Sequence, residues 1–334
     1  MWIKIGIAIG AGIASALLFI VTVQGTAIAM ALAYLAPLPL MIVCIGWGFD
    51  AGLIALGVSC AVVAGAIEPF SGLLFALTVA LPAWALAAFA NITALPTFNR
   101  KTEPAAPPMR ASLGAIVTLA ATFGALVSVG ALISMIVVYG GYEKGVEAFG
   151  AMLQPTIQEA LGGAANLPRD FSVDEIVRLV VKYSPAAIAS STTLMLLINL
   201  YAAARSAQLS QKLNRPWPDV PTSLSLPLAL GVIAVVAVGV WLAAPEPASQ
   251  FAVIFVGAFG IVYVLQGLAT LHALSRRLPA RPALLIAMYL ACLVAPRWVL
   301  PVVAVVGLIE SAASLRARAA ARPLHPQTQT PKRK

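Results

Sequence analysis

Charged residues are scarce in this chain, and their scarcity excludes a soluble globular protein. Only 10% of the 334 residues are charged, 61% are hydrophobic, and the mean hydropathy is +0.95. A water-soluble domain carries about 25% charged and about 45–50% apolar residues. The 21 Lys and Arg and 12 Asp and Glu residues cannot cover a soluble fold of this length. We therefore expect an integral membrane protein.

Residues that support catalysis or metal binding are also few. His272 and His325 are the only histidines, and the three cysteines show no C-x-x-C spacing. No phosphate-binding loop, H-E-x-x-H motif or nucleophile elbow occurs. Residues 46–51 match the dinucleotide fingerprint G-x-G-x-x-G/A, but that motif requires a soluble βαβ unit. We therefore expect no enzyme activity, no cofactor and no metal.

What the chain does have is a series of long apolar runs. Continuous runs indicate membrane helices, because the strands of a membrane barrel alternate polar and apolar residues. The first apolar run covers Ile5 to Val23, and apolar residues continue through Tyr34, which favours an uncleaved helix over a signal peptide cleaved near Ala27-Ile28-Ala29. The sequence predicts an all-α polytopic membrane bundle of about 8–10 segments. The further crossings are expected at 38–48, 51–67, 71–92, 112–139, 184–204, 224–244, 250–272, 283–295 and 298–315.

The basic residues indicate the orientation of the bundle. With the N-terminus inside, 16 of the 21 Lys and Arg residues fall on the cytoplasmic side. We therefore expect a bacterial inner-membrane protein with both termini cytoplasmic and the loop 140–183 outside. The net charge of +9 then reflects topology and contact with the lipid bilayer, not nucleic-acid binding.

Composition divides the chain into four parts. Residues 1–94 are N-terminal membrane helices, 95–111 a polar cytoplasmic linker, 112–316 the C-terminal membrane helices, and 317–334 a basic tail expected to be disordered. The outer loop 140–183 should hold two helices, one over 143–161 and one from the capping box at Ser172 through Lys182. We expect the second helix to lie as a lid near residues 190–193, the alternative being a fixed structural cap.

A proline- and glycine-rich stretch follows the first run. We expect it to stop and reverse the chain, making a broken hairpin around which the other segments pack. Asp50 is expected to cap the helix that follows. The residues of this motif are Pro37, Pro39, Gly46, Gly48 and Gly52.

Polar residues inside the apolar runs are the candidates for a ligand site, since such residues in membranes often mark function. The alternative for each is an interhelical hydrogen bond. Glu310 is expected to form an ion pair with Arg276 or Arg281, the alternative being a proton relay. The candidate lining residues are Asn91, Thr192, Thr193, Asn199 and Gln266.

Short motifs near both ends of the chain are similar to those of a known family. The break Pro37-Leu38-Pro39-Leu40 with its glycines, and the ending Gly307-Leu308-Ile309-Glu310, resemble the YybS-like family of bacterial membrane proteins. That family would have Asp at position 310 and an aromatic nearby, where this chain has Ser311-Ala312-Ala313. The family is distantly similar to the S components of energy-coupling factor vitamin transporters.

The S-component likeness implies a helical fold that binds a small ligand near the outer face. It also implies partners: a membrane coupling subunit with ATPases, docked on small-residue ridges of the first helix, Gly6-Gly10-Ala14 and Ala8-Gly12-Ala16. We therefore expect a small-molecule-binding transporter component without its own ATPase. The alternatives are a non-transporting envelope or morphogenesis scaffold and, third, a membrane enzyme.

Overall fold

The computed structural model describes residues 1–92, 112–161, 172–212, 218–276 and 278–321, and every regular element within these ranges is a helix. The first half holds α1 (Trp2–Ile20), a 3₁₀ turn (Val21–Gln24), α2 (Ala27–Ala33), α3 (Pro37–Trp47), α4 (Phe49–Ala66), α5 (Pro69–Phe75), a π-helical segment (Ala76–Ala80) and α6 (Leu81–Ile92). The second half holds α7 (Leu113–Tyr139), α8 (Tyr142–Ala160), α9 (Val173–Leu209), α10 (Val220–Ser223), α11 (Leu228–Ala243), α12 (Ala248–Ser275), α13 (Arg281–Val294), α14 (Pro296–Ala313) and α15 (Leu315–Ala321).

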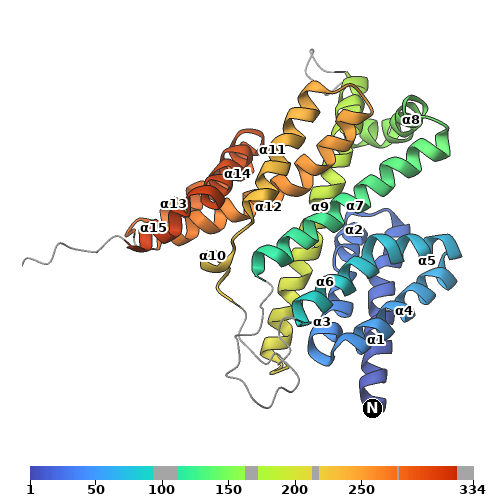
Figure 1. Ribbon diagram of the computed structural model, residues 1–334. Coiled ribbons are helices and arrows are strands. Elements are labelled where there is room, and N and C mark those ends of the chain that lie inside the picture. Colours follow the sequence, from blue (N-terminus) through green and yellow to red (C-terminus); the bar gives the residue numbers. More distant parts are fainter. Residues whose placement is uncertain (93–111, 162–171, 213–217, 277, 322–334) are drawn as a thin grey trace, which may run out of the picture.

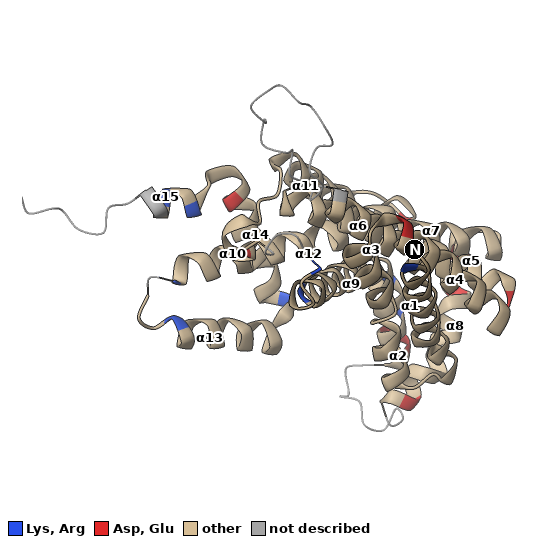
Figure 2. Ribbon diagram, turned by 90° about the horizontal axis from the view of Figure 1, so that it is seen from below, with Lys and Arg blue, Asp and Glu red and all other residues tan. Residues whose placement is uncertain are grey.

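The helices confirm the predicted membrane bundle. Among the described residues, eight helical stretches are long and apolar enough to cross a membrane, and α11 and α13 are shorter apolar helices. Charged residues lie mostly near helix ends, with long uncharged helical stretches between them (Figure 2). The predicted linker at 95–111 and most of the basic tail lie outside the described residues.

The long helix α9 joins the two halves of the fold (Figure 1). Its C-terminal half packs into the core formed with α1, α3 and α6, through Leu196, Leu200 and Ala203. Its N-terminal half packs with α7 and α12 in a second core, where Ala189 is fully buried. At 37 residues, α9 is about 55 Å long, against about 30 Å for the hydrocarbon core of a bilayer. It must therefore project beyond the membrane.

The first reversal of the chain lies earlier than the sequence predicted. Gly25 adopts a left-handed conformation (φ 64°), and the Thr26 hydroxyl oxygen accepts a hydrogen bond from the Ala29 amide to begin α2. The run expected over Ile5 to Val23 agrees with the first span, 2–24, but residues 27–33 belong to a second span, 27–47, which the sequence predicted only over 38–48. Hydropathy could not detect this turn, because both of its flanks are apolar.

The proline-glycine motif reverses the chain at one glycine only. Pro37 and Pro39 lie in the first turn of α3, where a missing N–H costs little, and 27–47 forms a single span. The reversal between α3 and α4 is made by Gly48 (φ 100°). Gly46 lies within α3, and Gly52 of α4 packs against Cys44, which a Cβ at residue 52 would approach to 2.7 Å.

Asp50 was expected to cap α4, and that expectation was wrong. The helix begins one residue earlier, at Phe49, with Gly48 as its N-cap and no side-chain cap. The Asp50 carboxylate is exposed and lies 3.7 Å from the Lys4 amine. It therefore ties the start of α4 to the start of α1.

The two small-residue ridges of α1 have different surroundings. Ala8, Gly12 and Ala16 are buried, and a Cβ at Gly12 would lie 2.6 Å from the Ala55 carbonyl oxygen of α4. This ridge is thus used within the chain. Gly6 and Gly10 on the other ridge are exposed.

The predicted lid helix is not a separate element. Ser172 and Glu175 form the expected capping box, but the helix that follows runs without interruption into the next crossing as α9. Leu179 and Val180 are exposed, and the buried side chains of this part are Val177 and Val181. The neighbouring helix α8 packs on this segment instead, with Val177 next to Gly150.

Candidate ligand-binding site

The polar residues that the sequence singled out lie at separate places in the bundle, and two of the first four link different segments of the chain. The Asn199 amide donates to the Tyr34 carbonyl at 2.7 Å, and the Asn91 amide donates to the Cys44 carbonyl at 3.0 Å. The Thr193 hydroxyl donates to the Ala189 carbonyl of its own helix at 2.7 Å. Thr192 is half-buried beside it. These residues do not converge on one cavity.

Gln266 is the centre of the most extensive polar network among the described residues. Its side chain is fully buried in α12. The amide nitrogen donates to the Gly307 carbonyl and to the Ser311 hydroxyl of α14, both at 2.7 Å. The amide oxygen accepts from the Leu226 backbone N–H at 2.6 Å. Gln266 thereby holds the extended segment between α10 and α11 against α14.

Glu310 lies in the same region and has a different partner from the one expected. Its carboxylate is 6% exposed and pairs with the Arg316 guanidinium at 2.8 Å, not with Arg276 or Arg281. The same guanidinium donates to the backbone carbonyls of Pro221 in α10 and of Leu224 directly after it. Glu310 is thus part of a structural ion pair that anchors the chain after α14.

Arg276 pairs with Asp219 at the start of α10. The guanidinium and carboxylate are 2.7 Å apart, and both side chains are about half exposed. A hydrogen bond from Thr222, and next the hydrogen bond from Arg276, lower the pKa of the Asp219 carboxyl. This exposed pair lies outside the membrane-spanning helices.

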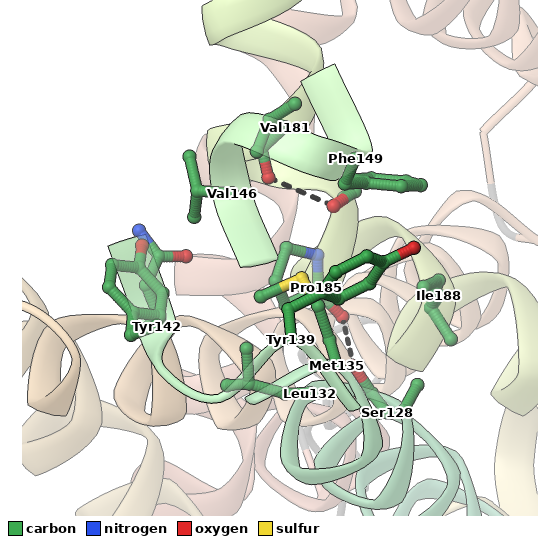
Figure 3. A pocket seen from close by; sticks show the side chains of 13 residues that line it. Ser128, Leu132, Met135, Tyr139, Tyr142, Val146, Phe149, Val181, Pro185 and Ile188 are labelled. Atoms are coloured by element: carbon green, nitrogen blue, oxygen red, sulfur yellow. Dashed lines mark hydrogen bonds between the residues drawn. The ribbon is translucent and has the colours of Figure 1, made fainter. Parts of the chain in front are cut away.

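A pocket of about 230 Å³ lies where α7, α8, α9 and α12 meet (Figure 3). Its walls are mainly apolar, with hydroxyl groups and one amide among them. In Figure 1 the helix α8 that covers it lies at the opposite end of the bundle from the N-terminus. The lining residues are Ser128, Ala131, Leu132, Met135, Tyr139, Tyr142, Val146, Phe149, Val181, Ser184, Pro185, Ile188 and Gln250.

Pro185 explains why a space opens in the wall formed by α9. A proline within a helix has no N–H for the carbonyl four residues before it, and its ring clashes with that carbonyl. The Val181 carbonyl accepts the Ser184 hydroxyl at 2.9 Å instead, and the Pro185 carbonyl accepts the buried Ser128 hydroxyl of α7 at 2.7 Å. The two serine hydroxyls thus donate to the Val181 and Pro185 carbonyls next to the proline, and the pocket wall has no unpaired carbonyl at these two residues.

Helix α8 covers the pocket because of a tight turn after α7. Gly140 (φ 69°) and Gly141 (φ 152°) have conformations that favour glycine, and they fold α8 back over the end of α7. Gly145 packs against Met135, which a Cβ at 145 would approach to 2.9 Å. Val146 and Phe149 of α8 then face the pocket (Figure 3).

One corner of the pocket is polar. Gln250, in the first turn of α12, is 2% exposed, and its amide nitrogen donates to the Glu246 carboxylate at 3.0 Å. Tyr142 of α8 lies at the same carboxylate. Burial, followed by the hydrogen bond and the negative charge of Glu246, raises the pKa of the Tyr142 hydroxyl. Tyr142 therefore stays neutral over the physiological pH range.

Sequence reasoning found parts of this pocket without identifying it. Val146 and Phe149 lie at helical spacing within the helix expected over 143–161, and Pro185 falls directly after the start of the crossing expected at 184–204, whereas the structure has it inside α9. Tyr142 and Gln250 gave no signal, since each looks like an ordinary residue at a helix end. Glu246 lies only four residues before Gln250, and the fold brings Tyr142 to the same carboxylate.

One comparison with known protein families gives a match that covers most of the chain. Residues 13–311 match the model of a family described as "Predicted membrane protein (DUF2232)". No curated protein matches, and no solved structure matches. The matched range includes the Gly48 corner, the pocket and Glu310, and it agrees with the resemblance to the YybS-like family. The chain belongs to the predicted membrane protein family DUF2232.

Proposed function

We propose that this protein is a small-molecule-binding component of the bacterial inner membrane, and that its ligand is a mainly apolar molecule held in the pocket beneath α8. The observation that supports this proposal is the pocket itself: four helices line it, and a few polar groups stand among its apolar walls. Ligand sites in proteins are typically apolar clefts with a few placed polar groups. The proposal is one of binding, not of catalysis.

The size of the pocket sets the size of the ligand. An apolar cavity of about 150 Å³ binds benzene, which has six non-hydrogen atoms. By the same ratio, the pocket of about 230 Å³ accepts about nine non-hydrogen atoms. This is the scale of a medium-chain alkyl or monocyclic aromatic compound.

The orientation of the bundle determines from which side the ligand enters. We propose that both termini are cytoplasmic, as the distribution of basic residues favours, so that α8 and the pocket face the outside. We further propose that any transport step draws its energy from a separate membrane subunit with ATPases, because the sequence has no phosphate-binding loop.

The proposal is tested by identifying what copurifies with the protein. Ala131 lines the pocket, so Ala131→Trp should fill it, whereas Ile133→Trp on the same helix places an equal ring on the exposed side. Organic extracts of the wild type and of Ile133→Trp should contain a small molecule that the extract of Ala131→Trp lacks. Identical extracts from all three folded proteins would contradict the proposal and favour the alternative of an envelope or morphogenesis scaffold.

A further inference from the structure

The pocket lies where the membrane-spanning helices reach the membrane surface. On this side of the bundle, the uncharged stretches of α7, α9 and α12 are bounded by Glu143, Lys182 and Glu246, and all three are exposed. Tyr142 directly precedes Glu143, and the Gln250 amide nitrogen donates to Glu246 at 3.0 Å. Charges next to membrane helices lie at the interface, because a charge within the hydrocarbon is costly. The end of the pocket at Tyr142 and Gln250 is therefore at the level of the lipid head groups.

Aromatic residues mark the same level. Tyr139 ends α7, and Tyr142 begins α8. On the neighbouring helices, the rings of Tyr183 in α9 and Trp241 in α11 meet edge to face, with their centroids 6.4 Å apart. Tyrosine and tryptophan are enriched at membrane–water interfaces because one end of each ring is polar. The two tyrosines of the pocket thus belong to the surface layer of the membrane.

The other end of the pocket lies within the hydrocarbon. Ala131 precedes Tyr139 by about 12 Å along α7, at about 1.5 Å per residue. Ile188 of α9 also lines this deeper part, and its one polar side chain is Ser128, whose hydroxyl donates to the Pro185 carbonyl. This end of the pocket therefore suits a chain without polar groups.

Helix α8 covers the pocket from the side of the water. Val146 and Phe149 are half-buried and face the pocket (Figure 3). Glu143, Lys144 and Glu147 of the same helix are exposed. An amphipathic helix of this kind lies in the plane of the interface, with its apolar side toward the hydrocarbon. Helix α8 therefore separates the pocket from water.

The pocket is open toward the lipid along one edge of α7. Ala131 and Tyr139 are the exposed residues of its lining, and both belong to α7. Ser134 and Val138 follow Ala131 at helical spacing and are exposed as well, whereas Ile136 on the other edge packs into the second core. Because α7 is long and apolar enough to cross the membrane, its exposed edge faces lipid.

We propose that the ligand is a single-chain membrane amphiphile that reaches the pocket from within the bilayer, past Ala131. Its alkyl chain occupies the deep end, and its head group stays at the membrane surface beside Tyr139 and Tyr142, outside the pocket. This inference rests on the proposed function, since it names the class of the ligand and its route into that pocket. The pocket then recognises the chain and tolerates a large head group.

Three probes separate recognition of the chain from recognition of the head group: 1-octanol, octyl glucoside and methyl glucoside. The first two share one chain, and a pocket of about 230 Å³ is too small to enclose the sugar together with that chain. Methyl glucoside carries the sugar without the chain. We would label methionine methyls with ¹³C in the protein in lipid nanodiscs and titrate each probe at levels that leave the discs intact. Met135 lines the pocket and Met41 is fully buried in the other core, so Met135→Leu assigns the pocket signal and Met41 reports on the fold.

In the wild type, 1-octanol and octyl glucoside should both shift the Met135 signal saturably. Their affinities, expressed as mole fractions of the lipid, should agree within about threefold, because the sugar has the same surroundings at the membrane surface in the bound and free states. Methyl glucoside should not shift Met135. The bilayer lipid competes equally with both alkyl probes, so the ratio of their affinities is unaffected.

The matched variants are Ala131→Trp, which should cover the opening and remove both shifts, and Ile133→Trp on the exposed side of the same helix. Ile133→Trp should leave both affinities within about threefold of the wild type. A response to 1-octanol without one to octyl glucoside would show an enclosed pocket, which overturns the membrane amphiphile and leaves the binding function standing. A Met135 shift with methyl glucoside, or equal responses of the wild type and Ala131→Trp, would also overturn this inference. If neither alkyl probe shifts Met135, the proposed function fails as well, and the wild-type series decides this even where a variant does not fold.

Discussion

Replacing Gln266 with leucine tests whether the buried amide holds the segment between α10 and α11 in place. Leucine has nearly the same volume, so the substitution removes hydrogen bonds without opening a large cavity. The Ser311 hydroxyl keeps the Leu226 carbonyl as an acceptor at 3.1 Å. The main loss is at the Leu226 N–H, which has the Gln266 oxygen as its partner.

The size of the effect follows from that one N–H. A buried donor without a partner costs about 1–3 kcal/mol. Interhelical hydrogen bonds in membranes average about 0.6 kcal/mol, which sets the lower end of the range. We therefore expect Gln266→Leu to destabilise the protein by about 0.6–3 kcal/mol.

Thr270→Val is the matched control, one turn further along α12. The Thr270 hydroxyl donates only to the Gln266 carbonyl of its own helix, at 2.9 Å, so its removal leaves no other group unpaired. Thermal unfolding of both variants in the same detergent, followed by tryptophan fluorescence, compares them directly. Equal melting temperatures for the two variants would refute the reasoning about the Leu226 N–H.

The remaining predictions concern packing, pH and topology. Gly257→Ala should destabilise the fold by about 1–3 kcal/mol, because its Cβ would collide with the Ala186 carbonyl oxygen of α9 and lie 2.8 Å from the Ala186 Cα, whereas Gly260→Ala on the same helix has open space and should be neutral. The lowered pKa of Asp219 means that its contribution to stability is complete above pH 3.8 and is lost as the pH falls below that value. Asp219→Asn should therefore reduce the loss of melting temperature between pH 5 and pH 3, and an unchanged loss would contradict this. Topology reporters fused after Ala160 and after Gln208 should give opposite signals, and equal signals would refute the orientation.

The fold class, an all-α membrane bundle, could be predicted from the sequence because membrane helices depend on local composition. The apolar runs located the crossings, and the capping box at Ser172 correctly marked the start of α9. The first turn was missed because Gly25 lies between apolar residues that continue the same hydropathy. Helix reversals made by a single glycine leave a weak signal in composition.

The candidate site could be predicted only in part, because its residues interact across distant helices. Glu310 was expected to pair with Arg276 or Arg281. The structure pairs it with Arg316 instead, since α14 ends at the left-handed Ser314 and the chain then places Arg316 at the carboxylate. Gln266 was named as a candidate lining residue, with an interhelical hydrogen bond as the alternative. The structure has the alternative, since the buried amide donates to the Gly307 carbonyl of α14. The pocket combines side chains of four helices, so no single stretch of sequence could show it.

The most direct test of the account is a titration of 1-octanol against the ¹³C-methyl signal of Met135 in nanodiscs, comparing the wild type with Ala131→Trp. The account predicts a saturable shift of the Met135 signal in the wild type, no shift of the Met41 signal, and no saturable response in the filled variant. Equal responses of Met135 in both proteins, or a shift of Met41 as large as that of Met135, would contradict the claim that the pocket beneath α8 binds a small apolar ligand.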